Sequence, residues 1–409
     1  MNKSGMSLGK RLSILLGGSL FLGTLNLKLF LTRHPTHQKD FSRTRPFRWN
    51  WFRLGGRTST ANGRPFSLMT RKGTSNNLIL FFSGGGSAWD GRTALQPMGL
   101  GNLAAGKGFG YYFSHVAYYI LGLLNGILDH KNPLNPFKDW HAVHIPYATG
   151  DFHTGCGSTE YEDEGKRKTL FHYGRQNVLK SLEWLTGAIK KPERILVCGE
   201  SAGAFGSAFW TPYIRSLYPD SRLYYLADGA FLKYEKWPEV FDRAWKADFE
   251  KTFGYCPGED PIKSAFLYNA SSLGESIPLL HANTLYDGIL SAFQADMNGH
   301  ARKDELERNP EKHRPFVQEW SREMVETTKT LSESIPNYYY YLTDYSYDEK
   351  KGTTTHTLLR YDHFYKCREG GVAYYEWLAH IVLEDKRYSV GKSRVESCQD
   401  IGQTPHPLS

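Results

Sequence analysis

Residues 194–206 read RILVCGESAGAFG, an apolar run that leads into a Gly-x-Ser-x-Gly motif centred on Ser201. The apolar run has the composition of a buried strand, and residues 202–217 can form a helix. A strand, a sharp turn and a helix are the setting that a nucleophile elbow requires. The stretch therefore predicts a nucleophilic Ser201, with the backbone N–H of Ala202 offered to an oxyanion. The alternative is a serine that only caps the helix.

Strand-like and helix-like segments alternate along the rest of the chain. A helix is expected over residues 172–186, because apolar residues recur there at helical spacing. The other short apolar runs, each bounded by turn residues, are expected to be strands at 77–83, 141–146, 223–228, 278–284 and 337–343. This rhythm predicts an α/β fold with a mostly parallel central sheet and helices on both faces.

Three glycines follow the run at 77–83 directly. Gly84, Gly85 and Gly86 allow backbone amides to approach a ligand without a clash from side chains. A nucleophile elbow needs a second oxyanion donor from the loop after an earlier strand. We therefore expect this loop to supply it. The alternatives are a flexible loop and a phosphate-binding loop, but no Gly-Lys-Ser/Thr follows as the latter would require.

The base and its orienting acid should follow the serine in the order Asp, His. Asp287 lies just past the run at 278–284, and His356 lies past the tyrosine-rich run at 337–343. A histidine in such a loop can reach Ser201 while a carboxylate fixes its tautomer. Position alone leaves two rivals, which are Asp228 at another strand end and His363 near His356.

The charge of the chain is unevenly distributed. The formal net charge is +8, but residues 1–72 hold fourteen of the 50 Lys and Arg residues and only one of the 42 Asp and Glu residues. The rest therefore carries 36 basic against 41 acidic residues, a net charge of −5. Nucleic-acid enzymes normally carry positive charge on the folded surface, so a nucleic-acid partner is not expected.

Four regions are expected from these patterns. Residues 1–11 form a basic segment, 12–32 a signal anchor or signal peptide, 33–72 a basic linker, and 73–409 the catalytic domain. We expect a membrane-anchored or secreted protein whose catalytic domain lies outside the cytoplasm. Basic residues after the apolar segment favour the opposite orientation, so the topology stays open.

A chain that starts near residue 70 is expected to stay soluble and active, because every expected site residue lies beyond position 80. The alternative is that Phe47, Trp49, Trp51 and Phe52 pack on the domain as an edge strand.

No metal or organic cofactor is expected. The five cysteines match no zinc pattern, and their odd number leaves at least one unpaired within the chain. Asp151 and His153 are ligand-type residues without a third, so we assign them a loop-stabilising or pocket-lining role. Asn269 begins an N-glycosylation sequon, a triplet that is common by chance.

Five stretches, in order, resemble the pectin acetylesterase/Notum family of α/β hydrolases, especially its bacterial members. They are LILFFSGGGSAWD, NPLNPFKDWHAVHIPYATGDFHTG, HYGRQNVLKSLEWL, GESAGAFG and HTLLRYDHFY, which together span roughly residues 74 to 385. The resemblance implies a triad of Ser201, Asp287 and His356 and an oxyanion hole of Gly85, Gly86 and Ala202. Relatives often carry cysteine at the positions of Ala88 and Ala148, which implies that those disulfides are absent here or replaced, for instance through Cys156.

The sequence thus predicts a serine carboxylesterase of pectin acetylesterase type, which cleaves acyl and in particular acetyl esters through an acyl-enzyme. The expected partners are an ester substrate such as an acylated carbohydrate and, through the N-terminal segment, a membrane. Two alternatives remain open. One is an esterase or deacylase for lipid or longer acyl chains, and the other is a non-catalytic, membrane-anchored binding protein on a hydrolase scaffold.

Overall fold

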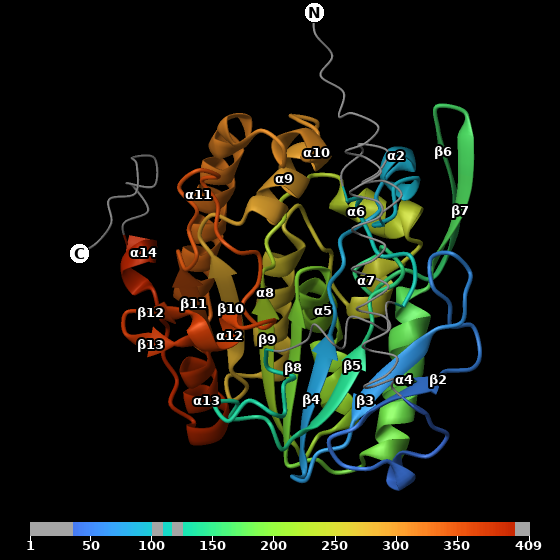
Figure 1. Ribbon diagram of the computed structural model, residues 1–409, viewed down its shortest axis with the longest axis vertical. Helices are drawn as coiled ribbons and strands as arrows, with labels where there is room; N and C mark the ends of the chain where they lie inside the picture. The colour runs from blue at the N-terminus through green and yellow to red at the C-terminus, as the bar shows by residue number, and fades with distance from the viewer. Residues whose placement is uncertain (1–35, 100–108, 117–125, 397–409) are drawn as a thin grey trace, which may run out of the picture.

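The computed structural model describes residues 36–99, 109–116 and 126–396. At its centre lies a nine-stranded sheet with the strand order β1-β2-β3-β5-β4-β8-β9-β10-β11 (Figure 1). All neighbours from β5 to β11 pair in parallel, whereas β3 is antiparallel to both β2 and β5. The mostly parallel sheet expected from the sequence is confirmed, and the arrangement is that of an α/β-hydrolase fold.

Each of the six strands expected from apolar runs is present, with its ends shifted by at most one residue. The sheet consists of β1 Thr36–His37, β2 Trp49–Arg53, β3 Ser67–Arg71, β4 Asn77–Phe82, β5 His141–Ile145, β8 Arg194–Glu200, β9 Arg222–Asp228, β10 Leu279–Thr284 and β11 Tyr338–Thr343. The central strands are buried on both sides, which explains why they read as continuous apolar runs rather than as alternating ones.

Alternate residues of the strands supply two separate hydrophobic cores. Leu80 and Val197 face one core, which is packed by α4 Gly174–Ala188, α5 Ala202–Leu217 and α8 Pro261–Leu273. Their strand neighbours Phe81 and Cys198 face the other core. That second core is packed by α12 His363–Lys366, α13 Tyr374–Glu384 and residues from the loop before β5. The expectation of helices on both faces is therefore confirmed.

The remaining elements surround the carboxyl ends of the strands or the edges of the sheet. An antiparallel hairpin, β6–β7, projects beyond the carboxyl ends of the strands (Figure 1). These elements are η1 Phe41–Arg43, α2 Gly91–Ala94, β6 Gly157–Asp163, β7 Lys166–His172, α6 Trp237–Glu239, the π-helical turn η3 Val240–Ala244, α7 Phe249–Phe253, α9 Gly288–Met297, α10 Lys303–Leu306, α11 Pro310–Ser334, β12 Arg368–Glu369, β13 Val372–Ala373 and α14 Lys392–Glu396.

The expected linker at 33–72 is wrong for most of its length. Residues 36–71 contribute β1, β2 and β3 to the sheet, and Phe52 and Phe66 are buried in the first core. Arg71 is itself fully buried, and its guanidinium donates to the backbone oxygens of Leu128 and Trp140. These strands were not predicted because the segment is basic and has no apolar run like those of the central strands. It joins the sheet through the pairing of β3 with β5. The alternative of an added strand is the one observed.

Removal of residues 1–69 is therefore expected to unfold the domain, in contrast to the sequence-based expectation. The cut deletes β1, β2 and most of β3, and with them Phe52, Phe66, Leu68 and Met69, which are at most 3% exposed. Each such side chain contributes about 1.5–3 kcal/mol by burial, so the summed loss is comparable with the whole stability of a typical domain. A chain that begins at residue 35 keeps all nine strands and serves as the control. Solubility and the thermal unfolding of both chains measure the difference, and a soluble, cooperatively folding product of the longer deletion would contradict it.

The structure also bears on the expected membrane segment, the cysteines and the glycosylation sequon. The expected membrane segment at 12–32 lies outside these residues, and none of the described helices is long and apolar enough to span a membrane. The four described cysteines are free, and Cys398 lies outside the described part. The sequon residue Asn269 is fully buried and donates to the backbone oxygen of Ala208, so it cannot carry a glycan in the folded chain.

Candidate active site

The Gly-x-Ser-x-Gly motif forms the sharp turn that the sequence predicts. Ser201 stands alone between β8 and α5 with φ 55° and ψ −130°, a conformation that is rare for a residue other than glycine. A Cβ on Gly199 would lie 2.1 Å from the Gly203 oxygen, and one on Gly203 would lie 2.1 Å from the Phe82 oxygen. The two glycines thus let the turn pack against β4. Ser201 makes no side-chain capping bond to α5, which contradicts the capping alternative.

The expected acid and base are in direct contact. Asp287 is fully buried at the N-terminus of α9, where its Oδ1 accepts the amides of Ile289 and Leu290, both at 2.9 Å. Its Oδ2 lies 2.5 Å from Nδ1 of His356. The carboxylate is therefore fixed by one oxygen and free to orient the imidazole with the other. The two loops also pair directly, because the amide of Thr354 donates to the Tyr286 oxygen at 2.8 Å.

The second ring nitrogen of His356 is available for proton transfer. Its Nε2 is buried and has no hydrogen-bond partner among the described residues, and His356 lines the same cavity as Ser201. Burial disfavours the protonated ring, but the charge of Asp287 and the hydrogen bond to it raise the pKa of His356 above its ordinary value. A base of this kind accepts a proton more readily than a free histidine.

The glycine loop after β4 and the start of α5 together provide backbone donors. The amides of Gly85, Gly86 and Ala202 meet no acceptor within the described ranges, and all three residues line the cavity. Gly86 has φ 77°, and a Cβ on Gly85 would lie 2.4 Å from the ring of Phe113. These amides match the residues expected to hold an oxyanion. The neighbouring Gly84 amide is already bonded to Oε1 of Glu200 at 2.9 Å.

Asp228 has a different role from Asp287. Its Oδ2 accepts the amides of Leu358 and Leu359 at 2.8 and 2.7 Å, and its own backbone oxygen accepts the amide of Ser201 at 2.8 Å. Burial raises the pKa of Asp228 to about 7, against the opposing effect of these amides. Asp228 therefore anchors the loop that carries the histidine, and no hydrogen bond joins it to the ring of His356. The other rival, His363, begins α12 on the second core.

A buried ion pair that sequence reasoning missed joins three parts of the site. Glu200, the residue before the nucleophile, is fully buried and lies 2.9 Å from Nη2 of Arg360. Its other oxygen accepts the Gly84 amide. The Glu200 side chain therefore connects the turn at Ser201, the glycine loop at residues 84–86, here called the oxyanion loop, and the loop that carries His356 and Arg360. The only sequence signal was the position of a charged residue at the end of an apolar strand, where burial requires a partner.

His153 contacts the start of the oxyanion loop, and Asp151 supports His153 by accepting its backbone amide at 3.1 Å. Nε2 of His153 lies 3.0 Å from the backbone oxygen of Ser83, and Asp151 accepts the hydroxyl of Thr149 at 2.6 Å and the amide of Gly174 at 2.9 Å. Both residues are buried. Their partners are protein groups, which supports the loop-stabilising interpretation, and the described residues contain no cluster that could hold a metal ion.

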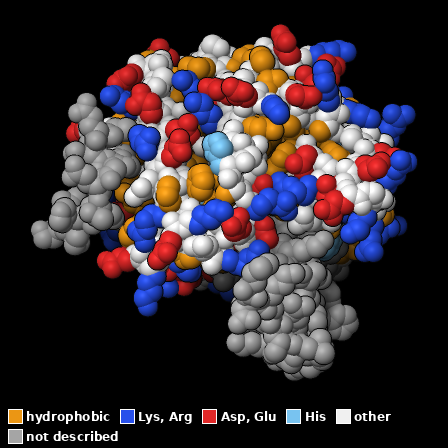
Figure 2. Space-filling view, turned by 90° about the horizontal axis from the view of Figure 1, so that it is seen from above, with side chains coloured by type: hydrophobic (Ala, Val, Ile, Leu, Met, Phe, Trp, Pro, Cys, Tyr) orange, Lys and Arg blue, Asp and Glu red, His pale blue; other side chains and the backbone are white. Residues whose placement is uncertain are grey.

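The cavity over Ser201 has a volume of about 350 Å³ and a largely apolar wall. It opens on the face at the carboxyl ends of the strands, where hydrophobic side chains lie among charged ones (Figure 2). Phe109, Ile289 and Tyr361 line it while remaining more than a third exposed, so they form its rim. No local sequence pattern predicts this wall, because its members come from segments far apart in the chain. Besides the rim and the site residues, they include Met98, Phe113, Phe152, Phe205, Leu232, Leu290 and Phe293.

Comparison with known proteins gives a match over the part of the chain that contains Ser201. No curated protein matches it, but residues 72–254 match the model of the pectinacetylesterase family. The matched region contains β4, the oxyanion loop and the nucleophile turn, whereas Asp287 and His356 come from the segments that follow it. Over these residues, which include Ser201, the chain is thus similar to the pectinacetylesterase family, and this similarity indicates a carboxylic ester hydrolase.

Proposed function

We propose that the protein is a serine carboxylesterase that works through a triad of Ser201, His356 and Asp287. The observation that carries the proposal is the unpartnered Nε2 of His356, which lies on the same cavity as Ser201 while Asp287 holds the opposite nitrogen at 2.5 Å. A histidine held in this way can take a proton from a serine and remain in the correct tautomer, which supports the proposal. The family match independently supports an ester hydrolase.

In the first half of the reaction, Oγ of Ser201 attacks the ester carbonyl carbon as its proton passes to Nε2 of His356. The carbonyl oxygen becomes an oxyanion held by the amides of Gly85 or Gly86 and of Ala202. The C–O bond to the alcohol then breaks, and His356 returns the proton to the departing oxygen. Water cleaves the acyl-enzyme by the same steps in reverse order, which releases the carboxylic acid and restores Ser201.

The size of the cavity favours an acyl group longer than acetyl as a second candidate. A volume of about 350 Å³ lies within the range of pockets that enclose whole small molecules. An acetyl group has a single methyl to bury, whereas each further methylene contributes about 0.8 kcal/mol in an apolar site. The wall contains four phenylalanines besides the rim, Phe113, Phe152, Phe205 and Phe293, which suits an alkyl chain better than a sugar.

The rate of hydrolysis of p-nitrophenyl acetate, butyrate and octanoate decides between these two substrate classes. We expect kcat/KM to rise from acetate to a longer ester, because the cavity wall is apolar. A maximum at acetate would favour the acetylesterase. A fluorophosphonate probe that labels the wild type but not Ser201→Ala would support either esterase. Failure to label and to hydrolyse any ester would leave the non-catalytic binding protein.

We also propose that residues 12–32 direct the protein to a membrane, with the catalytic domain outside the cytoplasm. The support is the apolar stretch behind Lys3, Lys10 and Arg11 in the sequence. Fractionation of cells that express the full chain or a chain starting at residue 35 tests it. Equal distribution of the two chains would contradict the proposal, and protease accessibility on intact cells reports the orientation.

A further inference from the structure

A short ribbon at residues 109–113 supports the oxyanion loop and at the same time forms one wall of the cavity. The amide of Phe113 donates to the Gly85 oxygen at 2.9 Å, and the amide of Ser87 donates to the Tyr111 oxygen at 2.8 Å. The side chains of Phe109 and Phe113 line the cavity. Any shift of this ribbon therefore changes both the position of the oxyanion donors and the space for an acyl group.

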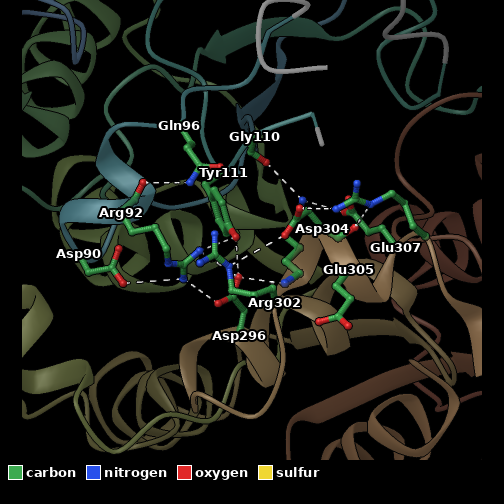
Figure 3. A network of polar contacts seen from close by, with 12 residues as sticks. Asp90, Arg92, Gln96, Gly110, Tyr111, Asp296, Arg302, Asp304, Glu305 and Glu307 are labelled. Carbon is green, nitrogen blue, oxygen red and sulfur yellow. Dashed lines mark hydrogen bonds and ion pairs between the residues drawn. The ribbon is translucent and has the colours of Figure 1, made fainter. Parts of the chain in front are cut away.

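The side chain of Tyr111 enters a buried polar network beside the cavity (Figure 3). Its hydroxyl donates to Oδ2 of Asp296 at 2.6 Å and accepts from Nη1 of Arg92 at 2.6 Å. Nη2 of Arg92 lies 2.6 Å from Oδ1 of the same aspartate. Tyr111 and Asp296 are 1% and 6% exposed, so these contacts are shielded from water. Charge-assisted hydrogen bonds in such surroundings are short and strongly directional.

Lys303 completes the network. Its amide donates to Oδ2 of Asp296 at 3.0 Å, and its Nζ donates to the Gly110 oxygen at 3.3 Å. The ammonium group also lies 5.4 Å from the centre of the Tyr111 ring and 2.7 Å from Oε1 of Glu307. Lys303 thus contacts both the backbone of the ribbon, at Gly110, and one of its side chains, that of Tyr111. We call Arg92, Tyr111, Asp296 and Lys303 the polar clamp.

The clamp joins the ribbon to α9, the helix that follows Asp287, the proposed acid. Helix α9 begins directly after Asp287 and presents Leu290 and Phe293 to the cavity before it reaches Asp296 in its last turn. Phe293 faces the ribbon, with its ring centre 6.0 Å from that of Tyr111. The two walls therefore belong to separate segments that the clamp holds together, one next to the oxyanion donors and one next to the acid.

We propose that the polar clamp is a specificity-determining device that fixes the spacing of these two walls and thereby the length of acyl group the cavity accepts. Its residues are positioning residues, since none of the four lines the cavity. The inference rests on the proposed function, because it assigns the cavity to the acyl group. With a clamp contact removed, the walls can separate, the cavity becomes less selective and longer chains fit.

Tyr111→Phe is the principal test, since it deletes only the shared hydroxyl and keeps the ring. The matched control is Tyr218→Phe, at the far end of α5 from Ser201. Tyr218 is 3% exposed and its hydroxyl donates to the Ile189 oxygen at 2.8 Å, so a buried hydrogen bond is lost there as well. Lys303→Met is a second clamp variant, which removes the ammonium group that lies 5.2 Å from the centre of the Phe293 ring and keeps an unbranched apolar side chain.

The probes are 2-alkanones of increasing chain length, which place a carbonyl and an alkyl chain in the cavity without being hydrolysed. Calorimetric titration of the wild type should show affinity rising about fourfold per methylene until the chain fills the cavity. In both clamp variants we expect the gain in affinity per methylene to fall to about twofold, because looser walls make fewer contacts with the chain. We also expect the chain length with the highest affinity to increase. Tyr218→Phe should match the wild type.

Identical chain-length dependence in the wild type and both clamp variants would overturn the proposal, as would the absence of ketone binding to a wild type that hydrolyses esters. An equal shift in Tyr218→Phe would also overturn it, because a general loss of stability would then explain the effect. The two proposals can fail separately. If ketones bind with the expected dependence but no ester is hydrolysed, the proposed function is wrong, and the clamp then sets the chain length that the cavity binds rather than that of an acyl group.

Discussion

Ser201→Ala should reduce kcat for ester hydrolysis by on the order of 10⁴-fold or more, because the nucleophile is lost while the oxyanion donors remain. The fold should be retained, since Ser201 makes no side-chain bond to the helix that follows it. Hydrolysis of a p-nitrophenyl ester and the thermal unfolding temperature measure the two effects.

Ser207→Ala is the matched control for this variant. Ser207 is buried in α5, the helix that follows Ser201, and its hydroxyl donates to the Ala204 oxygen at 2.9 Å, outside the cavity. We expect nearly wild-type kcat from it. Comparable rates for Ser201→Ala and the wild type would show that another residue attacks the ester.

Asp287→Asn should lower kcat by roughly 10⁴-fold, whereas Asp228→Asn should change it little. In the first variant the amide nitrogen faces Nδ1 of His356, so the ring adopts the tautomer whose proton sits on Nε2 and cannot accept one from Ser201. In the second, the asparagine oxygen still accepts the two amides that Asp228 binds, and a buried carboxyl with a pKa of about 7 is replaced by a neutral group.

The pH profile gives this prediction a second measurement. The base must be neutral, so kcat/KM rises as pH rises through the pKa of His356. Asp287 raises that pKa, and the acid limb of the wild type should therefore lie above pH 6.5. Asp287→Asn should move the limb to lower pH, whereas Asp228→Asn should leave it nearly in place. Equal losses in the two variants, or a larger loss for Asp228→Asn, would contradict the assignment of the acid.

The parallel core of the fold was predictable because its strands are buried on both sides. A run such as 194–199 is apolar without alternation, and its neighbours carry the same signal. The strands β2 and β3 carry no such signal. Arg71 counts as part of a basic arm in the sequence, yet in the fold it satisfies two backbone oxygens that only the packed structure brings within reach.

The candidate site was predictable where local geometry or chain order restricts the choice. Ser201 follows from a turn that needs glycines on both sides, and the acid and base follow from strand ends in the expected order. Asp228 ends one parallel strand and Asp287 lies just beyond another, and residue order cannot tell which carboxylate meets the histidine. The Glu200–Arg360 pair and the polar clamp join segments far apart in the chain, so no local pattern indicates them.

The strained backbone of Ser201 also limits how substitutions at this position can improve the protein. A non-glycine residue held at φ 55° and ψ −130° costs on the order of 1–3 kcal/mol in free energy of unfolding. Ser201→Gly would relieve that strain and remove the nucleophile in one step. Selection for thermal stability and selection for turnover therefore oppose each other at this single position, and improvement of one must come from residues elsewhere in the fold.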